Sequence, residues 1–120
     1  MSKLRVATLG LAVTVVLAWA VPAFAHQSGT TVTVKAGKPT AFAFTLSTKT
    51  VKHGTVTFKV TNAGVGLPHD FSINGKKTAQ LQPGKSATLV VTFAKAGNYA
   101  YKCTVPGHAA GGMKGVLKVT

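Results

Sequence analysis

The chain has 120 residues, which suits one small domain and is too short for two domains of ordinary size. Its single cysteine excludes a disulfide within the chain. Fourteen basic side chains stand against one acidic side chain, a net charge of +13, and almost all of the basic residues are lysines. Lysines without arginines are poorly suited to the forked contacts of a nucleic-acid reader, so we expect no nucleic-acid partner.

The first 25 residues have the layout of a secretory signal peptide. Two basic residues precede an apolar run over residues 6–21, and the small-residue pattern Ala23-Phe24-Ala25 follows. The run is shorter than the ~20 residues that a membrane-spanning helix needs, although an uncleaved anchor stays an alternative. We expect residues 1–25 to be cleaved off and residues 26–120 to form one exported domain, in the periplasm or at the cell surface.

The exported part shows the alternation typical of β-strands. β-Branched and aromatic residues recur at every second position, and no segment has a helical period. Runs of this kind occupy residues 31–35, 40–46, 54–60, 69–73, 86–93, 97–103 and 114–119. Turn signals separate the runs, at Ala36–Pro39, His53-Gly54, Asn74-Gly75, Pro83-Gly84 and Ala96-Gly97.

Short strands at regular spacing, separated by Gly and Pro turns, predict an all-β fold. The prediction is a Greek-key β-sandwich of seven to eight antiparallel strands, with an up-and-down barrel as the alternative. Residues 75–85 are the least strand-like part and could form a loop or a short helical turn.

The segment KCTVPGHAAGGM, residues 102–113, carries the residues best suited to chemistry. It places Cys103, His108 and Met113 on one loop, and Cys103 should point into the sandwich because its strand alternates. A blue-copper centre uses a thiolate, two imidazoles and a weak thioether. Of the other histidines, His69 is the best placed to supply the second imidazole, since it follows a Gly/Pro-rich turn before a strand. The alternative is a buried cysteine that packs as an apolar residue beside a chance histidine and methionine.

The segment YAYKCTVPGHAAGGMKGVLKV together with LPHDFSI resembles the cupredoxins, which are small type 1 (blue) copper proteins, and the similarity covers essentially residues 26–120. The resemblance implies one bound copper ion, and electron transport between redox partners by Cu(I)/Cu(II) cycling rather than enzymatic activity. It implies His69, Cys103 and His108 as equatorial metal ligands and Met113 as the axial one. Next to the site, the carboxylate of Asp70 could bond the Thr104 region.

Two alternatives use copper differently. A copper carrier or storage protein could hold the metal with the same ligands and no redox circuit. Signal cleavage would also leave His26 as the N-terminal residue, whose amine and imidazole could bind copper as in histidine-brace enzymes, with a second imidazole from His53. That alternative leaves Cys103 unexplained, and we otherwise expect His53 to be a turn residue.

We expect electrons to pass through an exposed edge of His108 within a small apolar patch. Its expected neighbours are Val65, Gly66, Leu67, Pro68, Pro106, Gly107, Ala109 and Ala110. Lysines around this patch would steer redox partners that have acidic docking surfaces, or an anionic membrane or cell surface. A basic surface that only keeps the protein soluble and monomeric is the simpler interpretation of the charge.

Overall fold

The computed structural model describes Gly10, residues 12–19 and residues 29–120. The expected cleavage point after Ala25 and the residue His26 lie outside the described residues, so the boundary between them stays a prediction. Gly10 and residues 12–19 have no regular secondary structure, and Trp19 is 85% exposed. In these described parts, no helix is long and apolar enough to cross a membrane.

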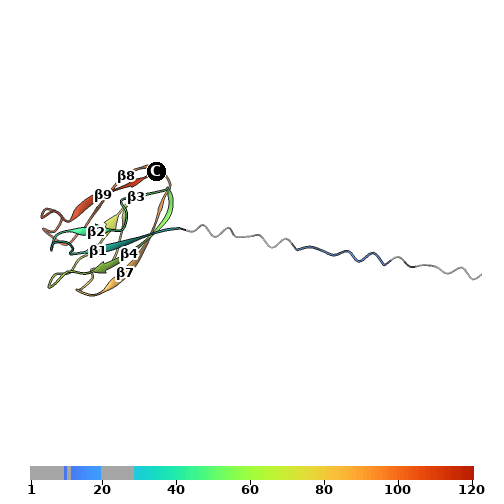
Figure 1. Cartoon of the computed structure of the whole chain (residues 1–120), viewed down its shortest axis with the longest axis horizontal. Coiled ribbons are helices and arrows are strands. Elements are labelled where there is room, and N and C mark those ends of the chain that lie inside the picture. Colours follow the sequence, from blue (N-terminus) through green and yellow to red (C-terminus); the bar gives the residue numbers. More distant parts are fainter. Residues whose placement is uncertain (1–9, 11, 20–28) are drawn as a thin grey trace, which may run out of the picture.

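The rest of the described chain folds as two packed β-sheets (Figure 1). A four-stranded sheet has the order β2-β1-β4-β7 and a five-stranded sheet the order β3-β9-β8-β5-β6. The nine strands are β1 (Thr30–Ala36), β2 (Phe44–Leu46), β3 (Thr50–Val51), β4 (Gly54–Asn62), β5 (Ser72–Ile73), β6 (Lys76–Lys77), β7 (Ser86–Phe93), β8 (Gly97–Lys102) and β9 (Lys114–Val119). No helix occurs among the described residues, which confirms the predicted all-β sandwich.

Both sheets are mixed, so the prediction of purely antiparallel strands was wrong. β1 runs parallel to β4, and β3 runs parallel to β9. Parallel neighbours need a crossover connection. Between β2 and β4 in the sequence the chain forms β3, which belongs to the five-stranded sheet, so the crossover passes through the other sheet. The alternation of side chains predicts which faces are buried and carries no information on strand direction.

Five of the seven predicted strands agree with the structure, and two are much shorter than predicted. The runs at 86–93 and 114–119 match β7 and β9, whereas the run at 40–46 forms a strand only from Phe44. The run at 69–73 is reduced to β5 and a single bridge between His69 and Leu81. In the segment expected to be a loop, Lys76 and Lys77 form β6, because Asn74 (φ 50°) and Gly75 (φ 74°) make the tight two-residue turn that pairs it with β5.

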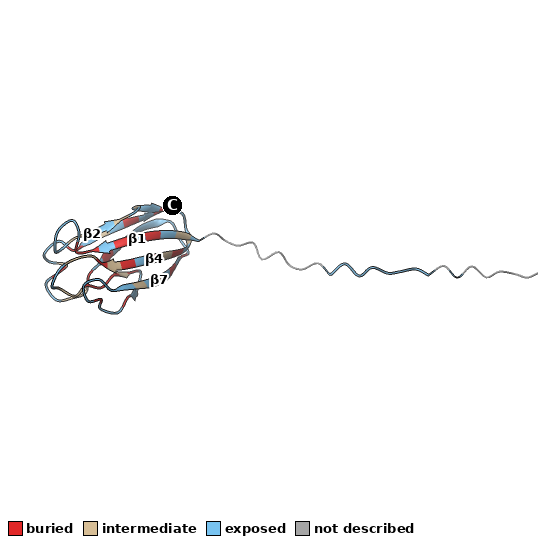
Figure 2. Ribbon diagram, turned by 60° about the horizontal axis from the view of Figure 1, so that its bottom comes forward, coloured by how far each residue is buried: buried red, intermediate tan, exposed pale blue. Residues whose placement is uncertain are grey.

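The core lies between the two sheets and is built from alternate residues of the long strands (Figure 2). Along β4, for example, Val56, Phe58 and Val60 are fully buried while Lys59 is exposed. In β8, Tyr101 is buried and Cys103 follows it two positions later with 1% exposure. The predicted inward direction of the Cys103 side chain is therefore confirmed, at one end of the core.

Candidate metal centre

Three connections meet at one end of the sandwich. They are residues 37–43 after β1, residues 63–71 after β4 and residues 103–113 after β8. The first two are joined by the Ala63 N–H, which donates to the Ala36 carbonyl at 2.9 Å. The strands fix where each connection starts and ends, so the side chains that these segments carry are brought together by the sheet topology.

The loop from Cys103 to Met113 is closed by its own backbone. The Cys103 N–H donates to the Met113 carbonyl at 3.1 Å, and the Met113 N–H donates to the His108 carbonyl at 3.0 Å. A further turn is formed where the Gly111 N–H donates to the Gly107 carbonyl at 3.0 Å. These bonds hold the loop without help from a metal, so the donor groups on it are preorganised.

The side chains of His69, Cys103 and His108 converge inside this end of the sandwich. Their ligand atoms all lie within 4.8 Å of one another, and all three residues are buried. Nδ1 of His69 lies 3.2 Å from Nδ1 of His108, which in turn lies 3.6 Å from Sγ of Cys103. Met113 is fully buried and packs in one small cluster with Cys103 and Ala36. The structure thus brings together the residues that the sequence singled out, and their role as ligands stays a prediction.

Two glycines set the direction of the His69 ring. A Cβ atom built on Gly37 would lie 2.7 Å from Gly64 Cα and 3.1 Å from Nε2 of His69, and one on Gly64 would lie 3.5 Å from the same Nε2. Any side chain at Gly37 would also be strained, since its φ is +80°. The back of the ring therefore rests on these two backbones, and Nδ1 faces His108. The sequence analysis missed both glycines, which only the spatial contact identifies.

The surroundings of His69 and Cys103 favour the uncharged forms of both side chains. Burial lowers the pKa of His69, and the nearby His108 lowers it further, so the imidazole is neutral at pH 7 and offers a lone pair. Burial raises the pKa of the Cys103 thiol, and hydrogen bonds from the backbone N–H groups of Asp70 and Val105 oppose this. The Asp70 N–H lies 3.5 Å from the sulfur. A bound cation would be needed to deprotonate the thiol fully.

Asp70 ties the His69 segment to the cysteine loop. It is 1% exposed, and its carboxylate accepts hydrogen bonds from both the backbone N–H and the hydroxyl of Thr104. The expected bond between Asp70 and the Thr104 region is confirmed. With its own N–H directed at Cys103, Asp70 links two of the three converging segments.

Asn62 holds the loop in front of His69, and the sequence analysis missed it. Its side-chain NH₂ group donates to the carbonyls of Leu67 and Leu81, both at 2.8 Å, and its Oδ1 accepts from the Gly64 N–H at 3.0 Å. A signal was present in the sequence: Asn62 occupies the next inward position after Val60, where alternation predicts an apolar residue. A polar group there must find partners inside the fold.

Phe42 covers His108, which corrects the expectation of an exposed histidine edge. His108 is only 7% exposed, and the Phe42 ring packs on it edge to face with a centroid distance of 5.0 Å. Phe42 is itself 38% exposed, and Val65 of the neighbouring loop is 88% exposed. The prediction failed because residue 42 was assigned to a strand, whereas β2 begins at Phe44 and Phe42 lies in the loop over the site.

The donor set fits a copper ion. A thiolate, two imidazoles and a thioether are ligands that serve both Cu(I) and Cu(II), and the soft sulfurs disfavour Mg²⁺ or Ca²⁺. Within the described residues these three His and Cys side chains form the sole group of its kind. His53 lies elsewhere, exposed and with its Nδ1 3.0 Å from the carbonyl of Thr120, as expected of a turn residue. Thr120 marks the end of the sandwich opposite the loops (Figure 1).

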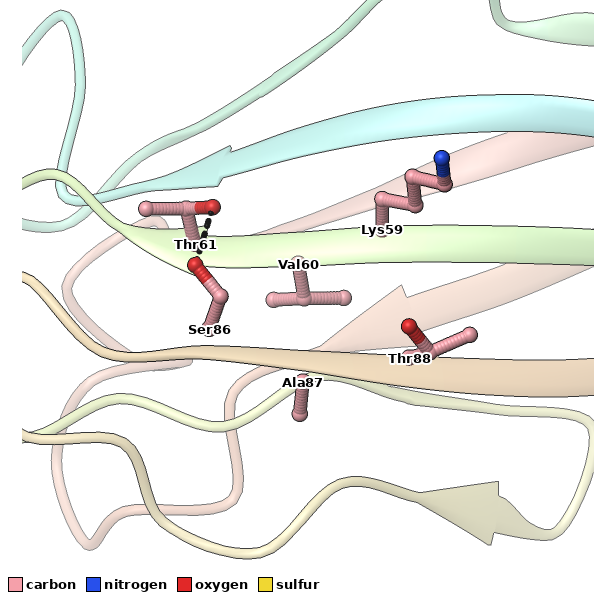
Figure 3. A pocket seen from close by; sticks show the side chains of 6 residues that line it. All are labelled: Lys59, Val60, Thr61, Ser86, Ala87 and Thr88. Carbon is pink, nitrogen blue, oxygen red and sulfur yellow. Dashed lines mark hydrogen bonds between the residues drawn. The ribbon is translucent and has the colours of Figure 1, made fainter.

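A surface hollow between β4 and β7 lies apart from this centre (Figure 3). The residues that line it are Lys59, Val60, Thr61, Ser86, Ala87 and Thr88. Two of its three hydroxyl groups bond each other, with Thr61 Oγ1 2.8 Å from Ser86 Oγ. Lysine is its sole ionisable group, so the hollow offers no set of metal donors.

Comparison with known proteins agrees with this geometry. A family model described as "Cupredoxin-like domain" matches residues 7–117. Curated relatives include Auracyanin-B of Chloroflexus aurantiacus, 46% identical over 43 residues (36% of this chain, 18% of that protein). The Copper-resistant cuproprotein CopI of Pseudomonas aeruginosa is 49% identical over 39 residues (32% and 22%). The Multicopper oxidase mco of Staphylococcus aureus is 35% identical over 68 residues (57% and 15%). The chain thus spans less than a quarter of the length of these relatives.

The matches to solved structures cover a larger share of both chains than the matches to the curated relatives do. Reduced auracyanin from the photosynthetic bacterium Roseiflexus castenholzii superposes with a TM-score of 0.65 at 26% identity, over 77% of this chain and 98% of the other. Rusticyanin from Thiobacillus ferrooxidans gives a TM-score of 0.63 at 26% identity, over 75% of this chain and 76% of the other. The similarity therefore extends across the sandwich and includes the end that carries the three donors.

Proposed function

Because the chain belongs to the cupredoxin-like family, we propose that it is an exported type 1 copper protein that carries single electrons between redox partner proteins. The observation that carries the proposal is the buried convergence of His69, Cys103 and His108 within 4.8 Å. Met113, buried beside Cys103, would complete the donor set with a weakly binding thioether. When bound, copper supplies the one-electron Cu(II)/Cu(I) couple.

The protein's own contribution is to keep the ligands in place. Each ligand lies at or next to a residue fixed by backbone hydrogen bonds, and Asp70 and Asn62 hold the segments together. A site that does not rearrange between two oxidation states lowers the reorganisation cost of electron transfer. Phe42 keeps bulk water from the His108 ring. Residues 63–68 and 104–112 carry no charged side chain and present a small face suited to a partner that docks briefly.

A copper carrier or storage protein is the second candidate. The similarity to the Copper-resistant cuproprotein CopI favours it, although that match covers only 32% of this chain. The same four residues would hold the metal in either case, so the site geometry alone does not separate the two functions. They differ in whether copper or the electron leaves the protein.

An enzymatic role has less support. The matched segment covers 15% of the multicopper oxidase, and the described residues of this chain hold one His/Cys cluster rather than several. The histidine-brace alternative depends on His26, which lies outside the described residues. Substitution of Cys103 separates it from the proposal, because a brace does not use the thiol.

The test compares electron exchange with copper exchange in the protein loaded with one equivalent of copper. Mixtures of the Cu(I) and Cu(II) forms are followed by NMR line broadening, and copper release is followed with a coloured Cu(I) chelator. An electron carrier should exchange electrons many times faster than it releases copper, and Cys103→Ser should abolish the exchange. Release that outpaces electron exchange would favour the carrier or storage function. Copper chemistry unchanged by Cys103→Ser would favour the brace.

A further inference from the structure

Three lysines form a row across the outer face of the five-stranded sheet, next to the metal centre. Strand register places Lys77 of β6 opposite Ser72 of β5, Ser72 opposite Lys102 of β8, and Lys102 opposite Lys114 of β9. Residues directly opposite one another project from the same face of a sheet. The three lysines are exposed while the adjacent Tyr101 is buried, so this face is the outer one. We call Lys77, Lys102 and Lys114 the lysine row.

No carboxylate side chain of this protein neutralises the row. Asp70 is the only acidic residue of the chain, and it is buried and bonded to Thr104. Lys102 and Lys114 are directly opposite each other, a like-charge arrangement that destabilises a strand pair. A row that costs stability and finds no anion within its own chain is suited to an anionic group from outside.

Two residues of the row are direct sequence neighbours of the candidate ligands. Lys102 directly precedes Cys103 in the sequence, and Lys114 directly follows Met113. Residues 63–68 and 104–112, two of the three connections around His108, contain no lysine, and the third, residues 37–43, contains Lys38. The expectation that lysines surround the His108 patch stays a prediction, and the lysine row adds positive charge on the side of the sandwich.

We propose that the lysine row docks an acidic protein surface, a partner face on which aspartate or glutamate carboxylates stand in a line. The proposal rests on the proposed electron-carrier function, since that partner would be a redox protein held beside the copper loop. Neighbouring strands lie about 4.8 Å apart, so the row extends over about 14 Å, the scale of a few side chains of a partner protein. The hydroxyl of Ser72, between Lys77 and Lys102, can donate to one of the carboxylates.

A protein face fits the row better than a lipid surface does. Toward the far end of the sheet, the next outward pair is Ala100 and Val116, which is uncharged, and Val116 is 52% exposed. This uncharged pair separates the row from Lys118, the next lysine on the same face, and a row of charge beside small apolar groups is typical of a protein interface. Anionic membranes favour a broad cluster of basic residues.

The experiment titrates the ¹⁵N-labelled full chain, in its diamagnetic Cu(I) form, with poly-L-glutamate and follows amide shifts by NMR. Shifts should cluster on β5, β6, β8 and β9, and binding should weaken as salt rises. Lys77→Gln/Lys114→Gln should bind roughly tenfold more weakly, the loss expected for two exposed charge pairs. The matched control Lys35→Gln/Lys59→Gln removes the same charge from exposed sites on the four-stranded sheet and should change binding by less than about twofold.

Three outcomes would overturn the proposal. Equal weakening by both double variants would mean that net charge alone binds the probe. An absence of shifts on the row would mean that it does not dock an acidic chain. Row-dependent binding to vesicles with 30% phosphatidylglycerol, without binding to poly-L-glutamate, would assign the row to a membrane. The titration needs no electron transfer, so a protein that binds poly-L-glutamate through the row but exchanges no electrons refutes only the proposed function.

Discussion

Asp70 offers the sharpest test of how the centre is held, because two substitutions separate its hydrogen bonds from its charge. Asp70→Ala removes the acceptor for the N–H and the hydroxyl of Thr104. Each buried donor left unpaired costs about 1–3 kcal/mol. Thr104 is partly exposed and water can reach it, so we expect a total near the lower end, about 2–3 kcal/mol. Asp70→Asn keeps one acceptor, and the Thr104 hydroxyl can turn to accept from the new NH₂ group, so its cost should be about 0–1 kcal/mol.

Urea and thermal denaturation of the copper-free protein measure the difference. For a domain of this size about 1 kcal/mol corresponds to about 4–8 °C in Tm, so Asp70→Ala should lower Tm by at least about 8 °C and Asp70→Asn by much less. Both variants should raise the Cu(II)/Cu(I) potential, because a nearby carboxylate favours the more positive ion. Equal destabilisation by both would show that the charge matters rather than the hydrogen bonds. No destabilisation by Asp70→Ala would refute the role given to the Thr104 bonds.

Three further substitutions probe separate parts of the site. Met113→Leu should keep the thiolate colour and raise the potential in voltammetry, since it removes a weak donor; an unchanged potential would mean that the thioether is not a ligand. In Gly115→Ala the new Cβ would clash with Oη and Cζ of Tyr101 and lie 2.9 Å from its Cε2, so the free energy of unfolding measured in urea should fall by about 1–3 kcal/mol, with recovery when Tyr101→Leu is added. Asn62→Ala should lower the free energy of unfolding by about 2–4 kcal/mol, because three hydrogen bonds are lost. It should also loosen the His69 loop and so speed copper release to a chelator. An unaltered release rate would contradict this.

The long strands were predictable because local alternation and burial agree in them. β4 buries every second residue over most of its length, the alternate residues of β7 are buried or half-buried, and both patterns are visible in the sequence. β3 and β6 have two residues each, too few to show a period, and they are strands only because β9 and β5 lie beside them. The parallel pairing of β1 with β4 likewise depends on a crossover through the other sheet, which no local pattern encodes.

The candidate ligands were predictable from chemistry, whereas the groups that support them were not. Cys103, His108 and Met113 share one loop, so their spacing is visible in the sequence. Phe42 and Gly37 belong to a different connection and reach the site only through the fold. The rare residue types were therefore recognised first, and the common ones that position them required the structure.

The most direct test of the central claim is the spectrum of the protein loaded with one equivalent of Cu(II). If His69, Cys103 and His108 hold the metal, the visible spectrum should show an intense thiolate-to-copper band, and electron paramagnetic resonance should show a narrow copper hyperfine splitting. A nearly colourless solution with an ordinary wide splitting would mean that nitrogen and oxygen groups hold the copper elsewhere, and it would contradict the account.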